Sequence, residues 1–332
     1  MPSTIYDLAN AAGVSIATVS RALNDHYAVS EKTKEKVKRL AEQMDFQPNA
    51  RARSFAKKRT GIILFVTDLY RNVAFENPHM FEIITGISGY LDEKNYSLLI
   101  KHISLKDAPG GIRELMNREQ ADGVIIHAAV LSKALAGVLC HMDKPYLVIG
   151  KPDFSTAICW MDVNHEQAGQ KAAGYLLDKG YRRMAFLMGN RETDRISAAR
   201  RCGMLSMFEE EELSFETYYG DSSYESGLKL AKHALTQRVR PEILLCTNNY
   251  IAMACLQVAG QMNLNVPKDV AVMTFDNYPF SMLVQPQLTA VEADMYDMGK
   301  EAARFILRKI KTPELHTQSF CTIPRVIERS ST

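Results

Sequence analysis

Six side chains between residues 15 and 21 could do chemistry together, because they combine hydroxyl groups, small apolar groups and one guanidinium on one side of a short helical segment. Val19, Ala22 and Leu23 fall at the spacing of an inward-facing stripe, which leaves the six to face outward. Such a face can donate hydrogen bonds to phosphates and to base edges in the major groove of DNA. The outward residues are Ser15, Ile16, Ala17, Thr18, Ser20 and Arg21.

A preceding helix is needed to hold this segment against a core, and the sequence predicts one. Thr4, with Asp7 three residues later, can cap its start. Gly13 supplies the positive φ of a sharp reversal, and Ser15 can accept the first free amides of the second helix. The pattern predicts a helix-turn-helix, although an ordinary helical hairpin would show the same pattern. The apolar stripe of the first helix is Ile5, Leu8, Ala9 and Ala12.

A third helix follows, capped by Ser30, and its charge supports contact with phosphates. Residues 1–60 hold 11 Lys and Arg against 6 Asp and Glu, a net charge of +5, whereas the whole chain carries only +2. A basic head on an acidic body is expected when one segment binds nucleic acid. The basic run 32–39 taken alone could equally be a solvated helix face. The apolar positions of the third helix are Val37, Leu40, Ala41 and Met44.

We expect the segment 47–59 to form a helix only when a partner chain or DNA contacts it. Pro48 ends the third helix, and Asn49 can cap one further short helical run. Such a short helix is unstable alone and should order only against a partner chain or DNA. A flexible basic linker is the alternative.

The sequence runs VSIATVSRALN, VSEKTKEKV and QPNARARSF resemble the DNA-binding head and hinge of the lactose/galactose-repressor (LacI/GalR) family of bacterial transcription regulators, and the resemblance extends from Thr4 to Phe320. It implies that Ile16, Ala17 and Arg21 occupy the base-reading positions. Of these three, Arg21 alone can make a bidentate contact to guanine. The resemblance also implies phosphate or positioning contacts by Thr4, Ser15, Thr18, Ser20, Asn24 and Asn49.

The hinge departs from the family at Phe55, where members usually place a leucine that wedges between two central base pairs. An aromatic ring can also unstack a base step from the minor groove, so kinking of the DNA is still expected. Arg51 and Arg53 flank this residue and are expected to contact phosphates or the groove walls.

The remaining 270 or so residues alternate apolar runs of strand length with helical segments. Continuous apolar runs indicate parallel strands buried on both faces, so we expect an α/β body with two doubly wound parallel sheets. Ligands in such sheets bind beyond the carboxyl ends of the strands, here in a cleft between two lobes. The expected strands are 62–67, 97–103, 123–127, 146–150, 184–188, 217–220, 243–246 and 270–275.

The runs ADGVIIH, KPYLVIGKP, GYLLDKGYRRMAFLMG, NVPKDVAVMTFDN and PQLTAVE resemble the family's regulatory domain, itself similar to periplasmic sugar-binding proteins. This implies three crossings between the lobes, near 158–162, 285–291 and 316–321. The expected domains are a head of 1–46, a hinge of 47–60 and a ligand-binding domain of 61–332. Its first lobe takes about 61–160 and 291–316, and its second lobe about 161–288 and 318–328.

Candidate ligand residues follow from the strand-end rule and the family's motif positions together. Asp276 in TFDN, Arg200 in ARRCG and Asn248 in CTNNYIAM match ligand-contacting positions of the family. Each has a structural alternative: Asp276 could cap a turn, Arg200 could pair with an acidic neighbour, and Asn248 could cap its helix. Lys151, after the strand-ending Gly150, is a further candidate. If the ligand is a sugar, stacking partners are expected among Tyr70, Phe75, Phe81 and Trp160.

Several residues depart from the family at the ligand site. Asn249 stands where aspartate is usual, Ser222 where several members have an aromatic ring, and His79 with Met80 replaces the usual pair of phenylalanines. The segments 68–77 and DVNHEQAG are more similar to the maltose-type branch than to the lactose type. This favours an α-glucoside or an oligosaccharide as the ligand.

Other chemistry has little support in the sequence. Six cysteines lack CxxC pairing or histidines at metal-ligand spacing, so we expect free thiols, no metal site and no cofactor. Motifs for hydrolysis, phosphoryl transfer or hydride transfer are absent from the sequence, which argues against an enzyme. The first residues are too polar for a secretion signal, and no apolar run reaches about 18 residues. We therefore expect a cytoplasmic, nucleoid-associated bacterial protein.

These features together predict a homodimeric, ligand-responsive transcription regulator on a nearly palindromic operator, with tetramers possible. The favoured form is a repressor of carbohydrate-utilisation genes that a sugar inducer releases. The alternatives are a corepressor, either a purine or a phosphorylated carrier protein, and a solute-binding protein without DNA contact, which would need export.

Overall fold

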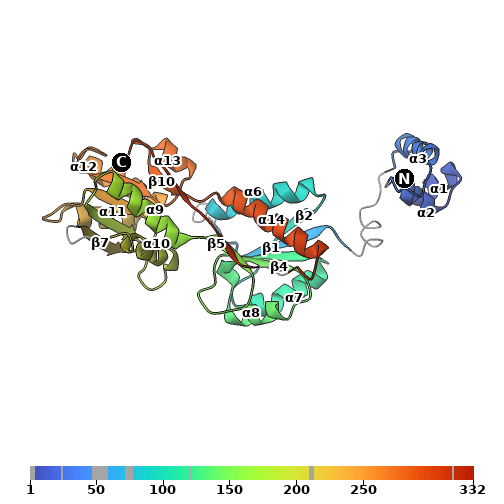
Figure 1. The fold of residues 1–332 in the computed structure, drawn as a ribbon, viewed down its shortest axis with the longest axis horizontal. Coiled ribbons are helices and arrows are strands. Elements are labelled where there is room, and N and C mark those ends of the chain that lie inside the picture. Colours follow the sequence, from blue (N-terminus) through green and yellow to red (C-terminus); the bar gives the residue numbers. More distant parts are fainter. Residues whose placement is uncertain are drawn as a thin grey trace. The chain divides into compact units, whose positions relative to one another are not determined.

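The computed structural model describes residues 4–23, 25–46, 59–71, 78–119, 121–208, 213–315 and 318–332. The chain divides into two compact units, Met1–Gly61 and Ile62–Thr332, and Figure 1 labels their elements. The first unit is called the head and the second the body.

The head contains three helices, α1 (Ile5–Ala12), α2 (Ile16–Leu23) and α3 (Glu31–Gln43), as the sequence predicts. Thr4 and Asp7 form a capping box on α1, and Gly13 has a φ of 66° in the reversal that follows. The backbone N–H of Thr18 donates to Ser15 Oγ at 3.1 Å, which caps α2, and Ser30 caps α3. The buried core lies entirely within the head: Leu8, Ala9, Ala12, Val19, Ala22, Val29, Val37 and Phe46.

The body is built on two six-stranded sheets of the same plan. In the first lobe the strand order is β11-β5-β4-β3-β1-β2, and all pairs are parallel. In the second lobe the order is β12-β10-β9-β8-β6-β7, with one antiparallel pair, β10 with β12. The first sheet comprises β1 (Ile62–Thr67), β2 (Ser97–His102), β3 (Gly123–His127), β4 (Tyr146–Ile149), β5 (Trp160–Val163) and β11 (Phe320–Thr322), and the second comprises β6 (Arg183–Met188), β7 (Ser214–Tyr219), β8 (Ile243–Cys246), β9 (Ala271–Thr274), β10 (Thr289–Glu292) and β12 (Arg325–Ile327).

Helices cover both faces of each sheet, so each lobe has two cores. Helices α6 (Pro78–Glu93) and α14 (Met295–Lys311) lie on one face of the first sheet, opposite α7 (Ala108–Arg118) and α8 (Lys133–Cys140). A short 3-10 turn, η1 (Ala128–Val130), follows β3. The second sheet has α9 (His165–Asp178) and α10 (Arg195–Leu205) on one face and α11 (Tyr224–Leu235) and α12 (Asn249–Gln261) on the other, with α13 (Pro279–Leu283) after β9. Within these described ranges no helix is long and apolar enough to cross a bilayer.

The structure confirms the doubly wound α/β class and corrects the expected lobe boundaries. The chain passes between the sheets at 163–165, 292–295 and 322–325, a few residues later than expected at each crossing. The reason is that β5, β10 and β11 are still paired in their own sheets where the sequence pattern had placed the crossings. Helix α14 returns to the first lobe, as predicted, and packs on α6.

Glycines allow one helix pair in the second lobe to pack backbone against backbone. A Cβ atom on Gly169 of α9 would overlap the carbonyl oxygen of Arg200 on α10. In return, a Cβ atom on Gly203 of α10 would overlap the carbonyl oxygen of Glu166. The position of α10, and with it that of Arg200, therefore depends on these two residues having no side chain.

The first lobe uses the same arrangement between α6 and α14. A Cβ atom on Gly86 would overlap the carbonyl oxygen of Tyr296, and one on Gly299 would overlap that of Ile83. Because both overlapped atoms are backbone carbonyl oxygens, the helices would have to separate to accept a methyl group.

Replacing Gly169 by alanine is expected to destabilise the body by about 2–3 kcal/mol, the usual cost of forcing extra volume into a packed site. Gly137→Ala in α8 is the matched control, because a Cβ atom there meets nothing within 4 Å and alanine favours a helix by up to about 1 kcal/mol over glycine. Urea unfolding of the two variants measures both effects. Equal midpoints for Gly169→Ala and Gly137→Ala would show that the close packing of α9 on α10 contributes nothing.

Candidate functional site

The outer face of α2 carries the residues that the sequence places there. Ser15, Ile16, Ala17 and Arg21 are exposed, whereas Thr18 and Ser20 are half-buried. The Ser15 and Thr18 hydroxyl oxygens lie 2.9 Å apart, so the start of the helix is fixed by its own side chains. Thr4 is exposed at the start of α1, where Thr4 Oγ1 lies 2.6 Å from Asp7 Oδ2. The other expected DNA contacts, Asn24, Asn49, Arg51, Arg53 and Phe55, lie outside the described residues.

A pocket of about 560 Å³ opens between the lobes of the body. Tyr70 and Pro78 contribute its first-lobe wall, and loops after the strands of the second lobe contribute the rest. Asn248 and Asp276 line this pocket, as the strand-end rule predicts. The second-lobe lining is Asp221, Ser222, Ser223, Tyr224, Glu225, Asn248, Asn249, Tyr250, Asp276, Tyr278 and Phe280.

A second cavity of about 200 Å³ adjoins the three crossings between the lobes. Arg200 lines this cavity and not the larger pocket. Tyr278 belongs to both linings, so the two spaces share a wall. The lining is His79, Glu82, Val163, Ala168, Arg200, Phe275, Asn277, Tyr278, Pro279, Val291, Glu292, Ala293, Asp294, Met295, Tyr296 and Pro324.

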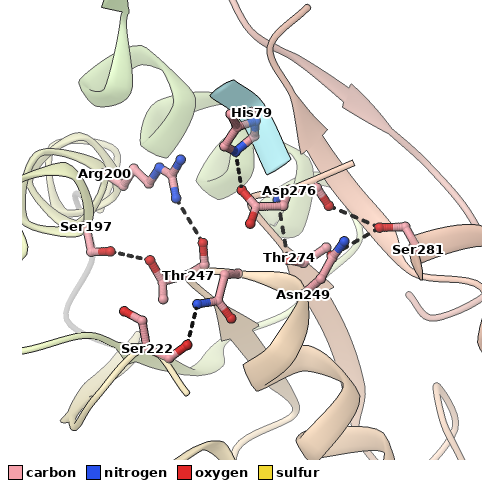
Figure 2. Close-up of polar contacts among 10 residues, drawn as sticks. His79, Ser197, Arg200, Ser222, Thr247, Asn249, Thr274, Asp276 and Ser281 are labelled. Carbon is pink, nitrogen blue, oxygen red and sulfur yellow. Dashed lines mark hydrogen bonds and ion pairs between the residues drawn. The ribbon is translucent and has the colours of Figure 1, made fainter. Parts of the chain in front are cut away.

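Asp276 is the buried carboxylate of the larger pocket, with 7% of its surface exposed. Its Oδ1 lies 3.0 Å from Nε2 of His79, which the first lobe contributes at the start of α6 (Figure 2). Ser281 Oγ lies 3.0 Å from the backbone oxygen of Asp276 and 3.1 Å from Oδ1 of Asn249, so the loop after β9 is held to the start of α12. Asp276 therefore presents a carboxylate to the pocket from a rigid loop.

Tyr278, two residues after Asp276, is a buried phenol beside this carboxylate. Burial raises the pKa of Tyr278, and the negative charge of Asp276 raises it further. The phenol therefore stays neutral and gives the pocket an aromatic face with one hydroxyl group.

Arg200 is a buried cation held by the backbone. Its Nη1 donates to the carbonyl oxygen of Thr247 at 3.0 Å (Figure 2), and its guanidinium lies 4.7 Å from the centroid of the Phe275 ring. Burial lowers the pKa of Arg200, while the carboxylate of Asp276 acts in the opposite direction. Arg200 Nε is buried, and among the described residues it has no hydrogen-bond partner. This donor is therefore available to a ligand atom in the smaller cavity.

Asn248 serves as a helix cap and as part of the pocket wall. Its Oδ1 accepts from the backbone N–H of Ile251 at 2.9 Å, which caps α12. Its Nδ2 donates to the backbone oxygen of Ser222 at 2.9 Å. The capping role expected as an alternative is thus present, and the residue still lines the larger pocket.

Three of the expected ligand residues do not line either cavity. Phe81 is exposed on α6, because the buried stripe of that helix runs through Met80, Ile83 and Ile87 and turns Phe81 outward. Lys151 lies with its ammonium group 5.7 Å from the centroid of the Trp160 ring, so these two contact each other within the first lobe.

The site also contains residues that the ligand prediction omitted: His79, Tyr278, Tyr250 and Phe280. His79 had a signal in the sequence, since it replaces a phenylalanine usual in the family. Tyr278 and Phe280 follow the strand-ending Asp276 closely enough to be found by the same rule.

Both units match models of known protein families. The model described as bacterial regulatory proteins, lacI family, matches residues 4–49, and that of a periplasmic binding protein-like domain matches residues 173–332. Catabolite control protein A of Priestia megaterium is 29% identical over 337 residues, covering 100% of both chains. The HTH-type transcriptional repressor PurR of Vibrio atlanticus is 27% identical, covering 99% of this chain and 98% of the relative.

Solved structures show the same fold. The lac repressor dimer bound to operator and the anti-inducer ONPF matches with a TM-score of 0.80 and 23% identity, over 100% of this chain and 99% of that one. A transcriptional regulator CelR-cellobiose complex matches with a TM-score of 0.70 and 23% identity, over 99% and 100%.

Asn248→Ala is expected to lower the stability of the body by about 1 kcal/mol, because α12 loses its N-cap. Asn248→Asp is the matched control, since a carboxylate can cap the helix while losing the amide donor to Ser222. Thermal unfolding of the two variants measures the difference. An unchanged midpoint for Asn248→Ala would contradict the capping role.

Proposed function

Because the chain belongs to the LacI/GalR family of bacterial transcription regulators, we propose that it is released from its operator by a neutral carbohydrate bound between the lobes. The chain is a ligand-regulated, DNA-binding transcriptional repressor of that family. Three features of this function are proposals: the identity of the effector, the residues that bind it, and the residues that read DNA.

The charge of the larger pocket is the observation that supports a neutral sugar. Among the residues that the structure describes, its lining includes the carboxylates of Asp221, Glu225 and Asp276 and no lysine or arginine. Carboxylates accept hydrogen bonds from sugar hydroxyls but repel a phosphate group. Aromatic side chains in the same lining offer faces for the apolar side of a sugar ring: Tyr70, Tyr224, Tyr250, Tyr278 and Phe280.

On the DNA side, we propose that a homodimer presents two α2 helices to a two-fold operator. Arg21 supplies the bidentate base contact, while Ile16 and Ala17 contact apolar base surface such as a thymine methyl. The proposed phosphate and positioning contacts are Thr4, Ser15, Thr18, Ser20, Asn24 and Asn49, and the proposed hinge contacts are Arg51, Arg53 and Phe55.

Arg21→Ala is expected to reduce the preference of the full chain for its operator over random DNA by about 5- to 150-fold, the 1–3 kcal/mol of one bidentate base contact. The operator is first selected from a random-sequence library, and affinities are then measured by fluorescence anisotropy at one salt concentration. Arg39→Ala, an exposed residue of α3 with the same loss of charge, should weaken both affinities by one common factor. A preference that survives Arg21→Ala would remove this residue from base reading.

A thermal-shift panel of maltose, cellobiose, ribose, glucose 6-phosphate and hypoxanthine tests the effector class, because a ligand that binds the folded state raises the melting temperature. A neutral sugar is expected to give the shift and to release operator DNA. A shift with hypoxanthine or glucose 6-phosphate alone would overturn the neutral-sugar proposal in favour of a corepressor or a charged effector. Maltose separates the expected α-glucoside from the other sugars.

Asp276→Ala is expected to weaken the effector by about 10-fold or more, since a hydrogen bond to a charged group contributes about 1.5–3 kcal/mol. Effector affinity is measured by titration calorimetry on the full chain. Asp153→Ala, an exposed residue of the first lobe, is the control. Unchanged effector affinity in Asp276→Ala would place the ligand elsewhere.

A further inference from the structure

The first lobe inserts one imidazole among the ligand-facing groups of the second lobe. His79 Nε2 lies 3.0 Å from Asp276 Oδ1 (Figure 2), and the His79 ring centroid lies 4.5 Å from that of Tyr278. The side chain of His79 is 30% exposed and that of Asp276 is 10% exposed. A hydrogen bond between partners 197 positions apart thus joins α6 of one lobe to the end of β9 in the other.

The imidazole stands at the boundary between the two cavities. His79 lines the smaller cavity together with Arg200, whereas Asp276 lines the larger pocket. Tyr278, on which the imidazole packs, lines both. Arg200 and Asp276 therefore line different cavities, and His79 contacts Tyr278 where these cavities adjoin.

The two charged groups differ in how their hydrogen bonds are satisfied. Asp276 is buried and uses the imidazole as a partner in the pocket, while the buried Arg200 Nε has no partner among the described residues. A carboxylate in a buried site must keep a partner, because an unpaired buried charge is costly. A ligand hydroxyl could replace the imidazole N–H on Asp276 without leaving that charge unpaired.

We propose that His79 is a latch: it bonds Asp276 in the effector-free protein, joins the two lobes there, and must be displaced before an effector reaches this carboxylate. The proposal rests on the proposed function above. In the exchange the Nε2–H···Oδ1 bond breaks, an O–H or N–H donor of the effector bonds Oδ1 instead, and no proton is transferred. The effector must therefore carry a donor for Asp276, and an acceptor for Arg200 Nε if it fills both cavities.

The latch has two consequences. Effector affinity is reduced by the fraction of molecules in which the latch is closed. Effector binding also removes the His79 contact between the lobes. The effector therefore binds the state with an open latch more tightly than the state with a closed latch. A ligand can shift the balance between two states only through such a difference in affinity. His79 is then a positioning residue for the response as well as a determinant of specificity.

A double-mutant cycle on the effector-free full chain tests whether the latch exists. His79→Ala and Asp276→Ala are each expected to lower the melting temperature of the body by about 2–4 °C, and the double variant no further than either single one. His79→Gln, which keeps an N–H donor at this position, should restore most of the loss. Additive effects of the two alanine variants would overturn the latch.

Titration calorimetry with maltose and with cellobiose then tests the exchange. His79→Ala is expected to bind the effective sugar about tenfold more tightly than the unsubstituted chain, and His79→Gln with nearly unchanged affinity. Weaker binding by His79→Ala would overturn the latch and make His79 a ligand contact. If neither protein binds either sugar, the carbohydrate proposal loses its support, and the effector-free cycle still decides whether the latch holds.

Discussion

A buried carboxylate needs a hydrogen-bond partner, and the loops around the larger pocket are arranged around that requirement at Asp276. The parallel sheet brings Asp276 to the carboxyl end of β9, where the loops of the second lobe converge. His79 supplies a partner from the first lobe. Because the partner comes from the other lobe, anything that replaces it also changes what holds the lobes together. Ligand recognition and the relation between the lobes are thus linked at one pair of atoms.

The pair of His79 and Asp276 can form only if α6 is placed accurately, and the cavity beside it likewise depends on the position of α10. Helix α6 packs on α14 through Gly86 and Gly299, and α10, which carries Arg200, packs on α9 through Gly169 and Gly203. The two lobes therefore use the same solution for the helices that bear ligand-facing side chains. Backbone contact without intervening side chains leaves little room for adjustment. Small movements of the lobes can then make or break the His79 contact as a discrete event.

The head and most strands could be predicted from the sequence because the patterns that specify them are local. Caps at Thr4, Ser15 and Ser30 and one apolar stripe per helix need no knowledge of distant residues. The strands β5, β10, β11 and β12 escaped prediction because they are short and include polar or charged residues. The strands β4 and β8 are also four residues long but are continuous apolar runs, and they were predicted. The four that escaped prediction are strands because a neighbour pairs with them, which is a property of the assembled sheet.

The ligand site was only partly predictable, for a similar reason. Asp276 and Asn248 follow from the strand-end rule, since the end of a strand is visible in the sequence. The contact of Asp276 with His79 joins residues 197 positions apart, and no local pattern shows it. Phe81 was expected to stack on a sugar because it is aromatic. The position of the residue around the helix was not considered, and α6 buries Met80 and Ile83 and turns Phe81 to solvent.

The closed core of the head constrains how an effector can act on DNA binding. Its buried apolar residues all lie between Leu8 and Phe46, so α2 keeps its shape and its outward face through contacts within the head. Asp276 and Arg200 belong to the other compact unit, so the contacts that shape the head do not include them. Under the proposed function, the effector must instead change how the two heads of a dimer are held relative to each other. Control then depends on the stretch of chain that joins the head to the body.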